Sequence, residues 1–179
     1  MKYVEAPERW EGSRGYDFTE SVFLAGSITG ARNWQAEMVG MLSVPLNERR
    51  ELVVMNPRRA NFDINVPGVA REQIAWEHHH LRKADAILFW FEENTLSPIT
   101  LFELGVWSER SQQLKGGVPW SAGTARPTCE LFVGVHPNFA RRFDVVEQLA
   151  LSRPDITVMD SSEGLADLAA LVLAWVNRE

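Results

Sequence analysis

The strongest chemical signal in this sequence is one acidic side chain inside an apolar helix pattern. Glu103 lies in residues 97–105 (SPITLFELG), where its immediate neighbours are apolar. A carboxylate in such surroundings is paired or functional. Near the amino end of a helix, where the dipole favours an anion, it suits a nucleophile that must stay ionised. Ser97 is placed to hydrogen-bond that carboxylate or a substrate. The alternative is a capping box, because Thr100 and Glu103 have its spacing.

A second acidic residue, Glu77, lies in a predicted helix on the same stripe as Ile74 and Leu81. If that stripe faces the core, this carboxylate also needs a partner or a function. Three consecutive histidines follow at 78–80, but on a helix they point about 100° apart and cannot converge on one ion. With only His136 besides them, we expect no metal site, and we expect the three histidines at the helix surface or a pocket rim.

A glycine-bounded turn, residues 26–30 (GSITG), directly follows the first strand pattern. Gly26 lets the backbone approach a ligand closely. The hydroxyl of Ser27 and the backbone N–H groups up to Ile28 are suited to a phosphate or a sugar hydroxyl. The motif is neither a dinucleotide fingerprint nor a P-loop, since it lacks the lysine of the latter. The alternative is an ordinary tight turn between strand and helix.

A basic motif, residues 56–59 (NPRR), follows the second strand pattern. Paired arginines can grip a phosphate or carboxylate through forked hydrogen bonds, so Asn56 and Arg58 are candidate substrate contacts. The alternative is that both arginines are solvated or form ordinary surface ion pairs.

Five short apolar runs alternate with helical patterns and predict the scaffold that positions these residues. The expected strands are Val22–Ala25, Leu52–Met55, Ala86–Phe91, Leu131–Val135 and Ile156–Met159. We therefore expect an α/β fold: a single doubly wound, flavodoxin- or Rossmann-like domain over residues 21–179, with about five parallel strands and helices on both faces. Residues 1–20 are expected to be an irregular lead-in. Ligands of such sheets bind beyond the carboxyl ends of the strands.

Composition limits the classes of function. The 179 residues carry a net charge of −6 and one cysteine, Cys129, which excludes a disulfide framework and a cysteine-rich zinc site. The acidic balance argues against a nucleic acid polymer or an anionic membrane as partner. No apolar run reaches the ~20 residues of a membrane span, and the first 20 residues lack a signal-peptide pattern. We expect a cytoplasmic protein.

Together these motifs resemble the nucleoside 2-deoxyribosyltransferase superfamily, and more narrowly its nucleoside 2-deoxyribosyltransferase-like branch. The segments that carry the resemblance are Phe23–Ile28, Asn56–Arg59, Trp76–Glu77, Ala84–Ala86 with its apolar strand, and Ser97–Gly105. The resemblance is specific from about Val22 to Gly105 and looser to about Leu149.

The resemblance implies cleavage of the N-glycosidic bond of a nucleoside or nucleoside 5'-monophosphate without a metal or organic cofactor. It implies that Glu103 is the nucleophile, that Ser97 contacts the sugar, and that the Gly26–Ile28 turn binds sugar or 5'-phosphate. Glu77 stands where relatives usually carry an Asp as the second acid, so it departs in side-chain length. Relatives are usually homo-oligomers that borrow a residue from the neighbouring subunit, and Asn138 is our candidate for that residue.

The expected mechanism is attack of Glu103 on C1' to give a covalent glycosyl-enzyme, with Glu77 protonating the leaving base. The acceptor is then another base or water. Trp34 is the first candidate to stack on the base, and Trp76, Trp90 and Phe91 are others.

Two other functions are also compatible with the sequence. One is a sensor that binds a nucleotide or an NAD derivative without turnover, because a fold alone does not fix a function. The other is hydrolysis of NAD, which also carries an N-glycosidic bond. The enzyme hypothesis requires that Glu77 and Glu103 face one pocket.

Overall fold

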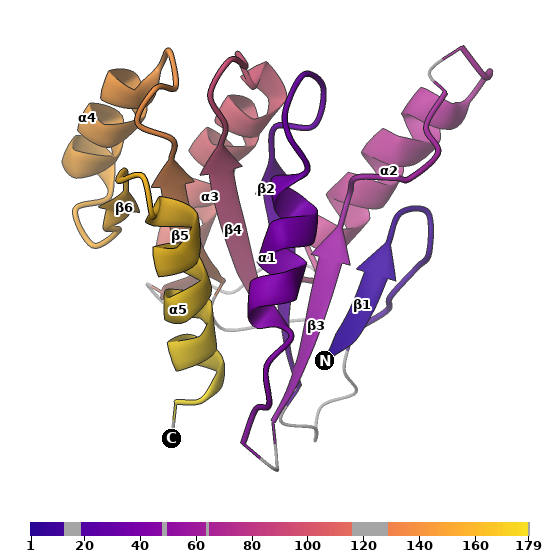
Figure 1. The fold of residues 1–179 in the computed structure, drawn as a ribbon, viewed down its shortest axis with the longest axis horizontal. Coiled ribbons are helices and arrows are strands. Elements are labelled where there is room, and N and C mark those ends of the chain that lie inside the picture. The colour runs from indigo at the N-terminus through magenta and orange to yellow at the C-terminus, as the bar shows by residue number, and fades with distance from the viewer. Residues whose placement is uncertain (13–18, 48–49, 64, 116–128, 179) are drawn as a thin grey trace.

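The structure, a computed structural model, describes residues 1–12, 19–47, 50–63, 65–115 and 129–178. These residues form one open sheet of six strands, all parallel, in the order β1-β3-β2-β4-β5-β6 (Figure 1). The strands are β1 (Lys2–Glu5), β2 (Thr19–Gly26), β3 (Glu51–Asn56), β4 (Ala86–Phe91), β5 (Glu130–Val135) and β6 (Val158–Met159). The doubly wound α/β arrangement is confirmed.

Helices cover both faces of the sheet, as expected. They are α1 (Trp34–Leu42), α2 (Val69–Leu81), α3 (Pro98–Lys115), α4 (Arg142–Ser152) and α5 (Gly164–Val176). One core cluster joins the sheet to α2, α3 and α4, and the other joins it to α1 and α5. Figure 1 shows α1 and α5 in front of the sheet and α3 behind it. Alternate residues of β4 supply the two clusters, which is why this strand is an unbroken apolar run.

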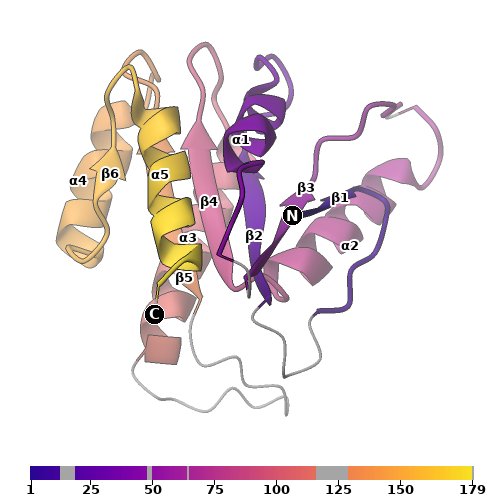
Figure 2. The ribbon, with the colours of Figure 1, turned by 60° about the horizontal axis from the view of Figure 1, so that its bottom comes forward.

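The sheet has six strands rather than five, because β1 pairs with the edge of β3. This strand comes from the segment expected to be irregular; residues 13–18 of that segment lie outside the described part of the chain. Only Val4 of its four residues is buried. A half-exposed strand of four residues is too short to produce a recognisable alternation, so the sequence pattern did not reveal it. In Figures 1 and 2, β1 and α2 lie at the same side of the molecule, opposite α4.

Gly26 is the last residue of β2, and β4 and the first residue of α1 approach it closely. A Cβ atom at this position would lie 2.4 Å from Trp34 Cζ2 and 2.4 Å from the carbonyl oxygen of Trp90. Trp34 itself has no exposed surface, and its indole N–H donates to the carbonyl of Ser27 at 2.8 Å. The first residue of α1 therefore packs under the turn that follows β2.

The helix pattern of α2 differs from the expected stripe. Ile74 is 66% exposed, whereas Gln73, Trp76 and His80 are buried. His80 was expected near the surface and is fully buried. Its Nε2 accepts a hydrogen bond from the backbone N–H of Trp10 at 3.0 Å, and its Nδ1 lies 2.8 Å from the carbonyl of Trp76. These two partners require a neutral ring with its proton on Nδ1.

Among the described residues, no helix combines the length and the apolar character that a membrane crossing requires.

The contact at Gly26 predicts a large difference between two glycine substitutions. Gly26→Ala should lower the free energy of unfolding by about 1–3 kcal/mol, because the methyl group overlaps a buried indole and a backbone carbonyl. Gly40→Ala, within α1 and with no described atom within 4 Å of its Cβ position, should instead raise the free energy of unfolding by about 0.5–1 kcal/mol. Urea unfolding of both variants measures this, and equal effects would contradict the packing described.

His80 predicts a loss of stability in mild acid. Burial lowers the pKa of His80 below its ordinary value of 6.5, with His79 and Arg9 opposing its protonation and Glu11 favouring it. The unfolded chain therefore takes up the proton first as the pH falls, and stability falls with it. Between pH 7 and 5 the free energy of unfolding should drop more steeply for the wild type than for His80→Gln. His78→Gln, at an exposed position of α2, should keep the wild-type slope.

Candidate active site

A pocket of about 540 Å³ opens at the carboxyl ends of β2 and β4. These are the central strands from which the chain winds in opposite directions, the place where open α/β sheets bind ligands. The residues that line it are Phe23, Ala25, Gly26, Ser27, Ile28, Thr29, Pro57, Glu77, Asn94, Thr95, Leu96, Ser97, Pro98, Ile99, Thr100 and Glu103. Six of the ten residues singled out in the sequence therefore meet here: Gly26, Ser27, Ile28, Glu77, Ser97 and Glu103.

The two acidic residues reach the pocket from different helices, Glu77 from α2 and Glu103 from α3. Burial raises the pKa of Glu103 to about 7, and the negative charge of Glu77 adds to the rise. Glu103 is thus close enough to Glu77 for their protonation to be linked. The sequence favoured a permanently ionised Glu103 at a helix start. The helix begins at Pro98, so Glu103 lies beyond its first turn, where the dipole has little effect.

Burial also raises the pKa of Glu77, while two neighbours oppose that rise. Gln73 Nε2 donates to Glu77 Oε1 at 2.8 Å, and the Arg59 guanidinium favours the anion electrostatically. The same Gln73 amide donates to the carbonyl of Pro57 at 2.7 Å, which ties α2 to the end of β3. Glu77 is therefore held on the pocket side of α2 with a pKa set by competing effects.

Three hydroxyl groups form a cluster at the wall of the pocket. Thr95 Oγ1 lies 3.0 Å from Ser27 Oγ and 2.9 Å from Ser97 Oγ, and the two serine hydroxyls also contact each other. Thr95 Oγ1 donates to the carbonyl of Glu92 at 2.8 Å. Because each hydroxyl can donate and accept, the cluster is suited to a sugar hydroxyl or a phosphate oxygen. Sequence reasoning missed Thr95, although a hydroxyl in the loop after a central strand was the available signal.

Ser97 has a left-handed backbone conformation, with φ at 45°. A non-glycine residue in that region is strained and persists only where its surroundings fix it. Here the hydroxyl cluster holds its side chain, and the next residue, Pro98, begins α3. Thr100 lies inside α3 rather than at its N-cap position, so the arrangement does not favour the capping-box alternative for Glu103.

The aromatic candidates for base stacking are not at the pocket surface. Trp34 packs behind the turn, and Trp76, Trp90 and Phe91 are between 0% and 3% exposed. None of the four lines the pocket. Their faces are covered because these residues build the cores on the two sides of the sheet.

Asn56 and Arg58 also point away from the pocket. Asn56 Nδ2 donates to the Tyr3 hydroxyl at 2.8 Å, and its Oδ1 accepts from the backbone N–H of Arg58. The guanidinium of Arg58 donates to the carbonyls of Ala31 and Arg32. Asn56 thus ties the end of β3 to the strand β1, and Arg58 ties it to the loop before α1. Asn138 lies beyond β5, where its amide donates to Glu93 at 3.1 Å; a role in a neighbouring subunit stays a prediction.

Arg59, next to Arg58, turns the opposite way and lies near Glu77. Its side chain is only 8% exposed, and its Nη1 pairs with Glu72 of α2 at 2.9 Å. Nε and Nη2, which form the other edge of the guanidinium, are buried and have no hydrogen-bond partner within the described part of the chain. Arg58 and Arg59 belong to the same sequence motif, and only the fold shows that their side chains have different partners.

A family model described as "Nucleoside 2-deoxyribosyltransferase like" matches residues 19–118 of the chain. The match covers β2 to α3 and so contains all the pocket residues. No match was found among curated proteins.

The linked carboxyl groups predict a directional pKa change. Glu77→Gln removes one of the two causes that raise the pKa of Glu103, while burial remains. The pKa of Glu103 should therefore fall below about 7 but stay above its ordinary 4.5. Carbon-13 NMR titration of the glutamate carboxyl groups measures this. An unchanged pKa in Glu77→Gln would show that the two side chains are not coupled.

Proposed function

The chain belongs to the nucleoside 2-deoxyribosyltransferase-like family, and from this premise we propose that it cleaves the N-glycosidic bond of a deoxynucleoside or its 5'-monophosphate through a glycosyl ester on Glu103. Family membership indicates a nucleoside deoxyribosyltransferase-like enzyme. The covalent step, the substrate and the acceptor are the further content of the proposal.

The observation that carries the proposal is the presence of both carboxyl groups, Glu77 and Glu103, in one pocket, where burial and the charge of Glu77 raise the pKa of Glu103. Retaining cleavage of a glycosidic bond needs two carboxyl groups with different tasks, a nucleophile and an acid. Two buried neighbours of like charge do not both ionise readily, so near neutral pH the pair retains a proton for the leaving group.

In the first step a Glu103 oxygen attacks C1' and the bond from C1' to the base nitrogen breaks. The electron pair of that bond stays on the base, and Glu77 supplies the proton that neutralises it. In the second step the acceptor, another base or water, attacks C1' and releases Glu103. Glu77, now a carboxylate, takes the proton that the acceptor loses.

The approach to the transition state should move the shared proton toward Glu77. Positive charge develops at C1' in the oxocarbenium-like transition state, and it stabilises the anionic form of the nearer carboxyl group, Glu103. The remaining proton is then favoured on Glu77, beside the leaving base. Because the pKa of Glu103 is about 7, its ionisation near neutral pH costs little free energy.

The hydroxyl cluster of Ser27, Thr95 and Ser97 supports binding of the sugar end of the substrate. The amino end of α3 begins directly after it at Pro98, and free N–H groups at a helix start favour an anion. A 5'-phosphate and a sugar 5'-hydroxyl are both compatible with these donors. The proposal therefore includes nucleosides and their monophosphates.

The homo-oligomer expected from the resemblance remains part of the proposal. Leu96, Ile99 and Phe102, at and beside the pocket rim, are 64–70% exposed. Large apolar side chains grouped at the surface are typical of contacts between chains.

The test is release of free base, measured by chromatography after incubation with each common deoxynucleoside and its monophosphate. Base release should fall at least a thousandfold in Glu103→Ala, because a nucleophile that forms the covalent intermediate is essential. Adding a second base distinguishes transfer from hydrolysis. A new nucleoside identifies transfer, and sugar released alone identifies hydrolysis.

Glu109→Gln is the matched control, since it removes an exposed carboxylate from the same helix, away from the pocket. It should retain wild-type activity. Full activity in Glu103→Gln would exclude the covalent mechanism. Binding of a nucleotide without release of base from any member of the panel would favour the sensor instead.

A further inference from the structure

A second group of ligating side chains lies at the carboxyl ends of β4 and β5. Glu92 and Glu93 directly follow β4, and His136 directly follows β5. The parallel register pairs Phe91 with Val135, and the backbone N–H of His136 donates to the carbonyl of Phe91 at 2.8 Å. The sheet therefore fixes the relative positions of the three residues. One ligand atom from each lies within 4.8 Å of the others.

We infer that Glu92, Glu93 and His136 form a binding site for a divalent first-row transition-metal ion, such as Mn²⁺. None of these side chains lines the pocket of Glu77 and Glu103, and the ion has no part in the proposed glycosidic step. The site uses the fourth histidine and two acidic residues from the neighbouring strand end, and none of the three adjacent histidines at 78–80.

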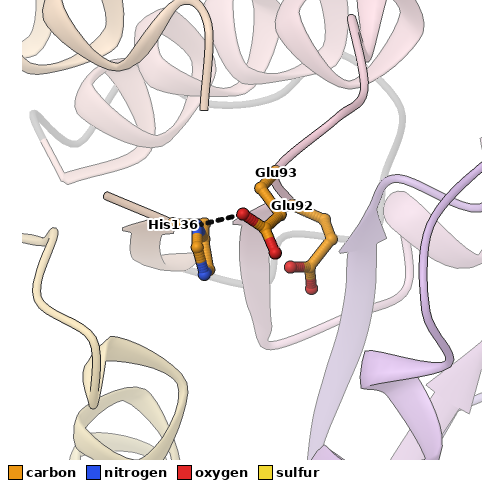
Figure 3. A group of neighbouring side chains, drawn as sticks. All are labelled: Glu92, Glu93 and His136. Carbon is orange, nitrogen blue, oxygen red and sulfur yellow. Dashed lines mark ion pairs between the residues drawn. The ribbon is translucent and has the colours of Figure 1, made fainter. Parts of the chain in front are cut away.

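The buried carboxylate of Glu92 supports this inference independently. Its side chain is 3% exposed. Oε2 accepts hydrogen bonds from the indole N–H of Trp90 at 3.0 Å and from Arg32 Nε at 2.9 Å. Oε1 is buried and has no hydrogen-bond partner among the residues that the structure describes. A buried carboxylate oxygen without a partner carries a large cost, which a cation at this carboxylate would remove. Figure 3 shows the Glu92 carboxylate directed toward that of Glu93.

The contact between Glu93 and His136 leads to the same conclusion. Nδ1 of His136 accepts a hydrogen bond from the backbone N–H of Asn138 at 3.2 Å, so this nitrogen carries a lone pair and no proton. Glu93 Oε2 lies 3.7 Å from the same nitrogen (Figure 3). Glu93 Oε2 also accepts a hydrogen bond from the Asn138 side-chain amide at 3.1 Å, and its remaining lone pairs and that of His136 Nδ1 leave two electron-rich atoms facing each other. A cation between them would attract both, and it would take over the lone pair now shared with Asn138.

The ligand set indicates the class of ion. Carboxylate oxygens suit Mg²⁺, Ca²⁺ and Mn²⁺, while an imidazole nitrogen suits the later first-row metals. A mixed set of two carboxylates and one imidazole therefore favours Mn²⁺, Fe²⁺ or Zn²⁺ over Ca²⁺. Arg32 pairs with both Glu92 and Glu37, so the carboxylates of Glu92 and Glu93 keep a net negative charge that favours a cation.

Ion binding would order the wall of the neighbouring pocket. The carbonyl of Glu92 accepts from Thr95 Oγ1, and its backbone N–H lies 3.4 Å from Ser27 Oγ. An ion held by the Glu92 and Glu93 side chains would fix the backbone that positions two members of the hydroxyl cluster.

The experiment is a Mn²⁺ titration of the full chain, freed of metal by a chelator and desalting, with free Mn²⁺ followed by electron paramagnetic resonance. The wild type should show one saturable site per chain. Glu93→Gln and His136→Gln should each weaken binding at least tenfold, because each removes a ligand. Zn²⁺ should displace Mn²⁺, since it binds such ligand sets more tightly.

Glu147→Gln, at an exposed acidic position of α4, is the matched control and should bind Mn²⁺ as the wild type does. Circular dichroism of each variant checks that it is folded. Glu93 and His136 are only partly buried, so their variants test the site even where Glu92→Gln fails to fold. Absence of saturable binding by the wild type at millimolar Mn²⁺ would overturn the inference. So would binding that Glu93→Gln and His136→Gln leave unchanged.

Discussion

The close packing around Gly26 is the constraint on which the pocket depends. A glycine at the end of β2 lets the Trp34 indole and the backbone of β4 come within a distance that no side chain permits. Trp34 then holds the carbonyl of Ser27, which turns the Ser27 hydroxyl toward Thr95 and Ser97. Ser97 in turn precedes the helix that carries Glu103. One steric condition thus leads, contact by contact, to the position of the nucleophile proposed here.

The parts of the fold with strong local patterns could be predicted from the sequence. Ala86–Phe91 is an unbroken apolar run and forms a strand with those bounds, and the turn after the first long strand lines the pocket as expected. Residues 77 and 103 are paired by the family resemblance rather than by the strand and helix patterns, and both line the pocket. The β1 strand could not be predicted, since its pairing depends on residues some fifty positions away and only Val4 is buried.

The directions of side chains beyond the strand ends also could not be predicted from the sequence. Arg58 and Arg59 have the same chemistry and adjacent positions, yet one joins loops and the other approaches Glu77. Trp34 has the residue type of a stacking platform but serves as packing beneath a turn. For residues that follow the end of a strand, the local sequence does not show which side of the backbone faces the pocket. The pKa of Glu103 is likewise raised first by burial and then by Glu77, which lies on another helix.

The pairing of β1 with β3 has a consequence for the order in which the protein assembles during its synthesis. Lys2–Glu5 is synthesised before β3, its strand partner among the described residues, which begins at Glu51. At about 5–20 residues per second, the N-terminal strand therefore waits for seconds before it can join the sheet. Three of its four residues are exposed or partly exposed in the finished fold, so little apolar surface is at risk of aggregation meanwhile. The central strand β2, by contrast, is mostly buried and reaches its partner β3 after a much shorter stretch of chain.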